Sequence, residues 1–141
     1  MNISSEEKMR ELGVAIGRAV SGGEVLELVG DIGAGKTTLT KGIAQALEIN
    51  EPVQSPTFTI LRVYDSPRGL SLAHYDFYRL GNAGIMSEEI REVAASNSVV
   101  VVEWAGAVDD ALPSDRLVIK ITAISEEGRL VEFYPGGKKS Y

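Results

Sequence analysis

A glycine-rich turn between an apolar run and an amphipathic run limits how this chain can fold. Residues 25–29 are mostly apolar and β-prone, as in a strand of a parallel sheet that is covered on both faces. The pattern Gly-x4-Gly-Lys-Thr follows at residues 30–37, and apolar residues then recur every four positions, which predicts a helix over residues 36–47. A strand, a tight turn and a helix in this order predict an α/β domain.

The turn has the spacing of a P-loop, and that spacing has a chemical reason. Glycines let the backbone turn back on itself and bring successive N–H groups towards phosphate oxygens. Lys36 can reach the β- and γ-phosphates as a point charge, and the Thr37 hydroxyl can ligate Mg²⁺. We therefore predict an ATP and Mg²⁺ site lined by Asp31, Gly33, Ala34, Gly35, Lys36, Thr37 and Thr38.

Two carboxylates are candidates for the metal and for the attacking water. Glu103 follows the apolar residues 99–102, a layout like that of a Walker B strand, and we predict that it holds a metal-bound or attacking water. Asp76 lies in a predicted strand, where His74, Asp76 and Tyr78 share one face. That face is either a site or a solvated edge, and His74, the one histidine, is more often a structural hydrogen-bonding residue than a catalyst.

Three further residues have both a functional and a structural interpretation. Thr57 lies at a turn into a strand, where it could reach the γ-phosphate or Mg²⁺ as switch residues do. Arg79 could stabilise transferred charge or form a surface salt bridge. Trp104 could contact a base or a partner, but core packing is the more common role of a tryptophan.

The rest of the chain predicts one domain over residues 1–141. Ser4 and Glu7 fit a capping box for a helix over residues 5–21, with Met9, Leu12, Ile16 and Val20 facing the core. We predict a hairpin from residues 57–64 and 70–78, a helix at 87–95, a strand at 99–102 and a last strand pair at 116–123 and 130–134. Residues 136–141 are expected to be a flexible tail. These elements predict a three-layer P-loop NTPase-type α/β domain, its mixed parallel and antiparallel sheet flanked by helices.

Composition excludes several classes of function. The 14 Lys and Arg against 20 Asp and Glu give a net charge of −6, which is unfavourable for direct capture of a nucleic-acid backbone. The absence of cysteine excludes disulfides and thiolate chemistry. The longest aliphatic run, residues 99–102, is far shorter than the roughly 20 residues that span a bilayer. We expect a cytoplasmic protein with no membrane contact.

Three functions remain open on the residues alone. The Asn-Lys-x-Asp motif with which Ras-type GTPases read guanine does not occur, and no arginine-rich lid segment is evident. A small Mg²⁺-dependent ATPase fits best. The alternatives are a P-loop kinase of small molecules and a nucleotide-sensing switch module that does not hydrolyse ATP.

Four motifs in one order closely resemble the TsaE (YjeE) family. They are residues 30–38, Ser-Pro-Thr-Phe at 55–58, His-Tyr-Asp-Phe-Tyr-Arg-Leu at 74–80 and Val-Glu-Trp at 102–104. The resemblance covers roughly residues 5–122. It implies a bacterial cytoplasmic ATPase that serves synthesis of N6-threonylcarbamoyladenosine at position 37 of tRNAs reading ANN codons.

The same resemblance implies partners and residue roles. TsaD and TsaB would be the partners, with tRNA reached only through that complex, and ATP hydrolysis would support turnover of the complex rather than the carbamoyl transfer. Matched to the family's motifs, Lys36 and Thr37 would contact phosphate and Mg²⁺, Asp76 and Glu103 would be the functional carboxylates, and Thr57 would be a switch residue. Weak activity of the chain alone is expected, because no arginine finger is evident.

Overall fold

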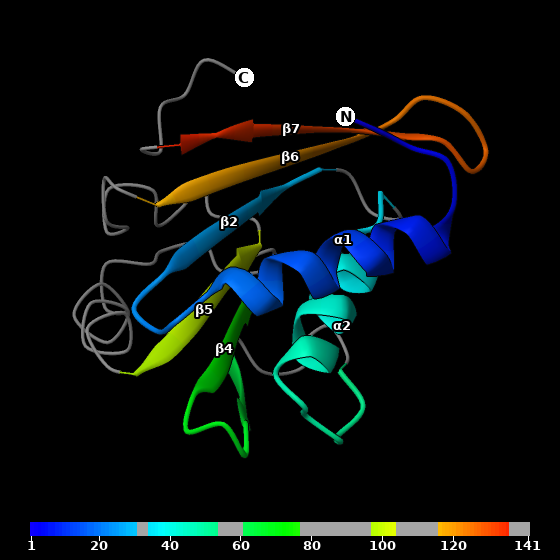
Figure 1. Cartoon of the computed structure of the whole chain (residues 1–141). Coiled ribbons are helices and arrows are strands. Elements are labelled where there is room, and N and C mark those ends of the chain that lie inside the picture. Colours follow the sequence, from blue (N-terminus) through cyan, green and yellow to red (C-terminus); the bar gives the residue numbers. More distant parts are fainter. Residues whose placement is uncertain (31–33, 54–60, 77–96, 104–115, 136–141) are drawn as a thin grey trace.

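The computed structural model describes residues 1–30, 34–53, 61–76, 97–103 and 116–135 (Figure 1). Within these ranges the chain forms two helices and one seven-stranded sheet. The helices are α1 (Glu6–Ala19) and α2 (Lys36–Ala46). The strands are β1 (Asn2–Ile3), β2 (Val25–Val29), β3 (Leu61–Asp65), β4 (Ser71–Asp76), β5 (Ser98–Glu103), β6 (Leu117–Ala123) and β7 (Arg129–Tyr134).

The sheet has a parallel centre and antiparallel edges, in the order β1-β7-β6-β2-β5-β4-β3. The four central strands, β6, β2, β5 and β4, run parallel to one another. At the two edges, β3 pairs with β4 and β7 pairs with β6 in antiparallel hairpins. The predicted mixed α/β sheet is confirmed. Because the four central strands are parallel, their carboxyl ends meet at one edge, which is where ligands bind in open α/β sheets.

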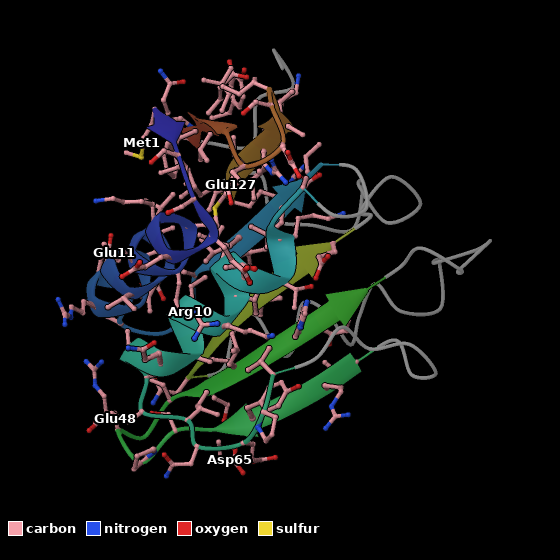
Figure 2. The ribbon with its side chains drawn as sticks, turned by 90° about the vertical axis from the view of Figure 1, so that its right-hand side faces the viewer. Met1, Arg10, Glu11, Glu48, Asp65 and Glu127 are labelled. Atoms are coloured by element: carbon pink, nitrogen blue, oxygen red, sulfur yellow. The ribbon has the colours of Figure 1, made fainter. Side chains whose placement is uncertain are left out.

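Both faces of the central strands are buried. In β5, Val99 and Val101 belong to the core cluster that includes Leu39 and Ile43 of α2, and side chains alternate along a strand. Val100 and Val102 therefore point to the opposite face, where both are also fully buried. Figures 1 and 2 show α1 and α2 together on one side of the sheet. Glu103 is in phase with Val99 and Val101, so it lies on the helix side.

Helix α1 confirms most of the predicted pattern but not its cap. Ser5, not Ser4, is the N-cap, and its hydroxyl accepts a hydrogen bond from the N–H of Lys8. The prediction was wrong by one residue because Ser4 and Ser5 are both good caps, and the choice depends on the extended backbone at Ser5. The helix also ends at Ala19 rather than residue 21. Its predicted apolar residues do pack on the core.

Helices α1 and α2 pack backbone to backbone through glycines. A Cβ on Gly42 would lie 2.2 Å from the carbonyl oxygen of Arg10 and 2.9 Å from the Cα of Gly13. Gly17 lies in the same way against Ile43. This close contact explains why α2 keeps a glycine in its interior, a position that would cost about 1 kcal/mol relative to alanine in an isolated helix.

The two predicted hairpins form, with slightly different ends. Three other predictions lie outside the described residues: the helix at 87–95, the flexible tail at 136–141 and the strand residues at 57–60 and 77–78. The short strand β1, which pairs with β7, was not predicted because its two residues carry no periodic pattern. No helix in the described part of the chain is long and apolar enough to span a membrane.

Candidate functional site

The first turn of α2 follows the P-loop at the carboxyl edge of the sheet. Gly35 is the N-cap, with a left-handed backbone (φ 115°) and no side-chain cap. The hydrogen bond from the N–H of Leu39 to the carbonyl oxygen of Gly35 (3.0 Å) closes the first turn, so earlier amides have no acceptor within the helix. No acidic residue lies in this turn. Such a helix end is suited to binding an anion.

Lys36 brings the only buried ammonium group of the described residues to this edge. Its Nζ donates a hydrogen bond to the carbonyl oxygen of Gly30 (2.7 Å) and lies 3.8 Å from Oε1 of Glu103. The Lys36 side chain is 6% exposed and that of Glu103 is 3% exposed. The structure therefore brings together the predicted lysine and the predicted carboxylate from two neighbouring strand ends.

The second oxygen of Glu103 is engaged by a histidine. His74 of β4 is fully buried, and its Nε2 is hydrogen-bonded to Oε2 of Glu103. When the carboxylate is ionised, this bond requires the proton on Nε2. Nδ1 of His74 is buried and has no hydrogen-bond partner among the described residues. The sequence favoured a structural hydrogen-bonding role for His74. Its partner is Glu103, so this hydrogen bond lies at the candidate site.

Asp76 lies beside Glu103 in the sheet. The two residues are register partners at the ends of β4 and β5, so their Cα atoms are neighbours across the ladder. The register therefore places Asp76 and Glu103 side by side at the carboxyl edge of the sheet. The role of Asp76 in metal binding or catalysis stays a prediction.

The other predicted residues divide into two groups. Ala34 is buried, Thr37 lies in the first turn of α2, and the Thr38 hydroxyl contacts Oε1 of Glu6 at 3.4 Å. The Thr38 side chain thus faces α1, which leaves its main chain as the part suited to bind phosphate. The remaining candidates lie outside the described residues; they are Asp31, Gly33, Thr57, Arg79 and Trp104.

Contacts that the sequence did not reveal support the P-loop from two sides. Met9 of α1 packs on Gly35, where an added Cβ would lie 3.2 Å from its Cε. Gly30 lies against β6, because an added Cβ would lie 2.6 Å from the carbonyl oxygen of Ile121. Arg129 donates from Nε to the carbonyl oxygen of Ala34 (3.0 Å). No spacing pattern in the sequence predicts these contacts, since each joins distant segments.

The donor set is of the kind that binds Mg²⁺ together with phosphate. Among the residues that the structure describes, no three His, Asp or Glu side chains form a metal cage. Mg²⁺ in phosphate sites is usually held by one or two carboxylates, waters and the phosphates themselves. A threonine hydroxyl and a carboxylate, such as those of Thr37 and Glu103, are donors of the kind that could complete such a site.

Comparison with known proteins gives one consistent match. A family model described as "Threonylcarbamoyl adenosine biosynthesis protein TsaE" matches residues 3–131. The chain is 43% identical over 115 residues to the tRNA threonylcarbamoyladenosine biosynthesis protein TsaE of Streptomyces coelicolor, which covers 80% of this chain and 78% of that protein. It is 41% identical over 119 residues to the protein of the same name from Bacillus subtilis, which covers 83% and 73%.

A solved structure matches the whole fold. The crystal structure of YdiB from Bacillus subtilis aligns with a TM-score of 0.80 at 33% sequence identity. The alignment covers 96% of this chain and 83% of that chain. A likeness over this share of the chain supports the α/β class derived above.

Proposed function

Because this chain belongs to the TsaE family, we propose that it serves tRNA threonylcarbamoyladenosine biosynthesis as a Mg²⁺-dependent ATPase. The family resemblance expected from the four motifs is confirmed, and with it a P-loop protein of the nucleotide-binding type. One observation carries the proposal of hydrolysis. The Lys36 ammonium and the Glu103 carboxylate lie 3.8 Å apart at the edge where the P-loop strand and its neighbour end.

In this proposal each group has a separate task. An ammonium group has three donors, so Lys36 can keep its bond to Gly30 while it binds β- and γ-phosphate oxygens of ATP. The Thr37 hydroxyl would ligate Mg²⁺, with Asp76 as a second candidate. Glu103 would accept a hydrogen bond from the attacking water and hold it in line with the γ-phosphate. Mg²⁺, when bound, neutralises charge that develops on the phosphate oxygens.

The proposed setting follows from the family and the charge of the chain. We expect TsaB and TsaD as partners and the cytoplasm as location, with the whole of residues 1–141 acting as one domain. Direct tRNA capture is unfavourable at a net charge of −6, so tRNA would be reached through the complex. ATP hydrolysis would then support turnover of that complex.

Steady-state release of phosphate from Mg·ATP tests the proposal. The wild type should hydrolyse ATP slowly alone and faster with TsaB and TsaD. Lys36→Ala should abolish nucleotide binding, and Glu103→Gln should lower kcat by about 10²-fold or more while ATP still binds. Lys41→Ala is the matched control, because Lys41 is an exposed lysine on the same helix.

Three results would contradict the proposal. Equal hydrolysis by wild type and Lys36→Ala, with and without partners, would exclude the P-loop as the active site. Transfer of the labelled phosphoryl group from ATP to a small molecule, with no inorganic phosphate released, would indicate a kinase instead. Tight ATP binding with no effect of Glu103→Gln on partner-stimulated turnover would favour a switch module.

A further inference from the structure

Arg129 joins the P-loop to the turn between β6 and β7. Its Nε donates to the carbonyl oxygen of Ala34 at 3.0 Å. Its Nη1 donates to three carbonyl oxygens of the turn, those of Ser125 (3.0 Å), Glu126 (3.3 Å) and Gly128 (2.8 Å). One guanidinium group thus holds two segments that are about 95 residues apart in the chain. Glu127, labelled in Figure 2, marks this turn.

The contact to Ala34 controls more than one atom. The carbonyl of Ala34 and the N–H of Gly35 belong to the same planar trans peptide, so they point in opposite directions. When Arg129 holds the oxygen, the N–H of Gly35 is directed away from Arg129. Gly35 has a φ of 115°, and a glycine can adopt several peptide orientations that other residues cannot. A contact that holds the carbonyl of Ala34 therefore selects one of these orientations for the N–H of Gly35.

Strands β6 and β7 contact the P-loop at both of its ends. Gly30, at the start of the P-loop, lies against the carbonyl oxygen of Ile121 in β6, and Ala34 is 3% exposed. The β6–β7 turn is closed by its own hydrogen bond, from the N–H of Ile124 to the carbonyl oxygen of Gly128 (3.1 Å). Both ends of the loop thus rest on one hairpin.

We propose that Arg129 is a positioning residue for nucleotide binding, which orients the Gly35 N–H towards the α- and β-phosphates. The inference rests on the proposed ATP site, because it assigns a donor within it. Backbone N–H groups of a P-loop cradle the α- and β-phosphates, so the effect should be equal for ATP and ADP. A guanidinium group is required, since an ammonium group cannot hold the loop and the turn with the same fixed fork.

Calorimetric titration with Mg·ATP and Mg·ADP tests this role. Arg129→Met should weaken binding of both nucleotides by about tenfold, the equivalent of one charge-assisted hydrogen bond. Arg129→Lys should restore only part of the affinity. Arg68→Met is the matched control. This variant should bind both nucleotides like wild type, because Arg68 donates to the carbonyl oxygen of Ala46 at the end of α2 that is far from the P-loop. In hydrolysis, KM should rise with kcat changed less than twofold.

The outcomes separate this inference from the proposed function. If Arg129→Met binds both nucleotides within twofold of wild type while Lys36→Ala binds neither, the role of Arg129 is overturned and the ATP site stands. If the folded wild type binds no nucleotide, both are overturned. Should Arg129→Met fail to fold, NMR of the wild type decides: the Gly35 amide and the Arg129 Nε–H signals should both shift with Mg·ATP, and an unmoved Gly35 amide would overturn the inference.

Discussion

Glu103 is held between a lysine and a histidine, with one carboxylate oxygen directed to each. A buried carboxylate is costly unless it is paired and hydrogen-bonded. Lys36 lies 3.8 Å from Oε1, too far for a direct hydrogen bond, so His74 is the closer partner. The arrangement keeps Oε1 as the oxygen on the P-loop side, where the attacking water is proposed to bind.

Replacement of His74 should affect both stability and turnover. His74→Leu would leave Oε2 of Glu103 buried without its donor, which should lower the free energy of unfolding by about 1–3 kcal/mol and reduce kcat for ATP hydrolysis. His74→Gln should recover part of both, because its amide can donate from nearly the same place. Urea denaturation and steady-state kinetics measure the two effects. A His74→Leu variant with the kcat of wild type would show that the histidine does not position Glu103.

Lys36 and Glu103 could be predicted from sequence because each is fixed by a local pattern. Lys36 has a set place in the P-loop, and Glu103 directly follows a fully apolar run. The pairing of His74 with Glu103 could not be predicted, since it depends on the register between β4 and β5. The contact of Arg129 with Ala34 depends on packing between segments far apart in the chain. Asp31, Gly33, Thr57 and the side chain of Asp76 keep their predicted roles as predictions.

Helix α1 packs along the length of α2, the helix that follows the P-loop. Contacts run from Glu6 with Thr38 to Gly17 with Ile43, so the two helices run in the same direction. The contact of Gly13 with Gly42 fixes how closely they approach. The sequence predicted both helices from their apolar residues but not this contact, because glycines add nothing to an apolar pattern.

Alanine at position 42 should destabilise the protein although alanine is the better helix former. The added Cβ would lie 2.2 Å from a backbone oxygen that no rotamer change can move, so the helices must separate. We expect Gly42→Ala to lower the free energy of unfolding by about 2–4 kcal/mol. Gln45→Ala, at an exposed position of α2, should be neutral or slightly stabilising. Thermal and urea unfolding compare the two, and equal stability would refute the close contact.

The loop between α1 and β2 is closed by the carboxylate of Glu24. It accepts hydrogen bonds from the N–H groups of Ser21 (2.8 Å) and Gly22 (2.7 Å) and from the Ser21 hydroxyl (3.2 Å). Desolvation raises the pKa of Glu24, but these hydrogen bonds outweigh it and the net pKa is lowered. A carboxylate with a lowered pKa in the folded state stabilises the protein above its unfolded pKa.

Glu24→Gln should therefore lower stability in a pH-dependent way. At neutral pH the ionised Glu24 contributes fully, so wild type should have the higher Tm. As the pH falls below the ordinary glutamate value of 4.5 and through the lowered pKa of the folded state, the contribution is lost and the two Tm values should converge. Calorimetric scans between pH 7 and the acid limit of solubility measure the difference. A Tm difference that is constant with pH would contradict the assignment.

Within the described residues, Arg116 and Glu27 form a buried ion pair on the face of the sheet opposite the helices. Nε of Arg116 donates to Oε1 of Glu27 at 2.8 Å, and both side chains are 5% exposed. Glu27 is the central residue of β2, in phase with Val25, so it lies on the face opposite α1 and α2. A charge in the middle of a buried strand is costly unless it is paired, and Arg116 pairs it immediately before β6.

Single and double replacements should differ strongly for this pair. Arg116→Met should lower the free energy of unfolding by about 3–5 kcal/mol, because it leaves Glu27 charged and buried without this partner. Arg116→Met combined with Glu27→Leu should recover most of that loss, since no charge then stays in the interior. Urea denaturation of these two variants and of Glu27→Leu alone completes a double-mutant cycle. Additive losses would show that the two side chains act independently.

Most of the architecture that the structure describes could be predicted from the sequence. Apolar runs predicted β2 and β5, and the P-loop between β2 and α2 predicted parallel strands at the centre. Turn residues around Gly69 and Gly128 predicted the two antiparallel hairpins. The order of strands across the sheet could not be read, because the pairing of β2 with both β5 and β6 joins segments that are distant in sequence.

The shared direction of α1 and α2 places two like poles side by side at the edge of the sheet. Helix α1 neutralises its own pole with Glu6 and Glu7, whereas α2 has no acidic residue in its first turn. The pole with no acidic residue of its own belongs to the helix that carries Lys36 and Thr37. A phosphate group arriving from solution would therefore complete the electrostatics of the fold itself, so that binding at this helix end and stability of the helix pair rise together.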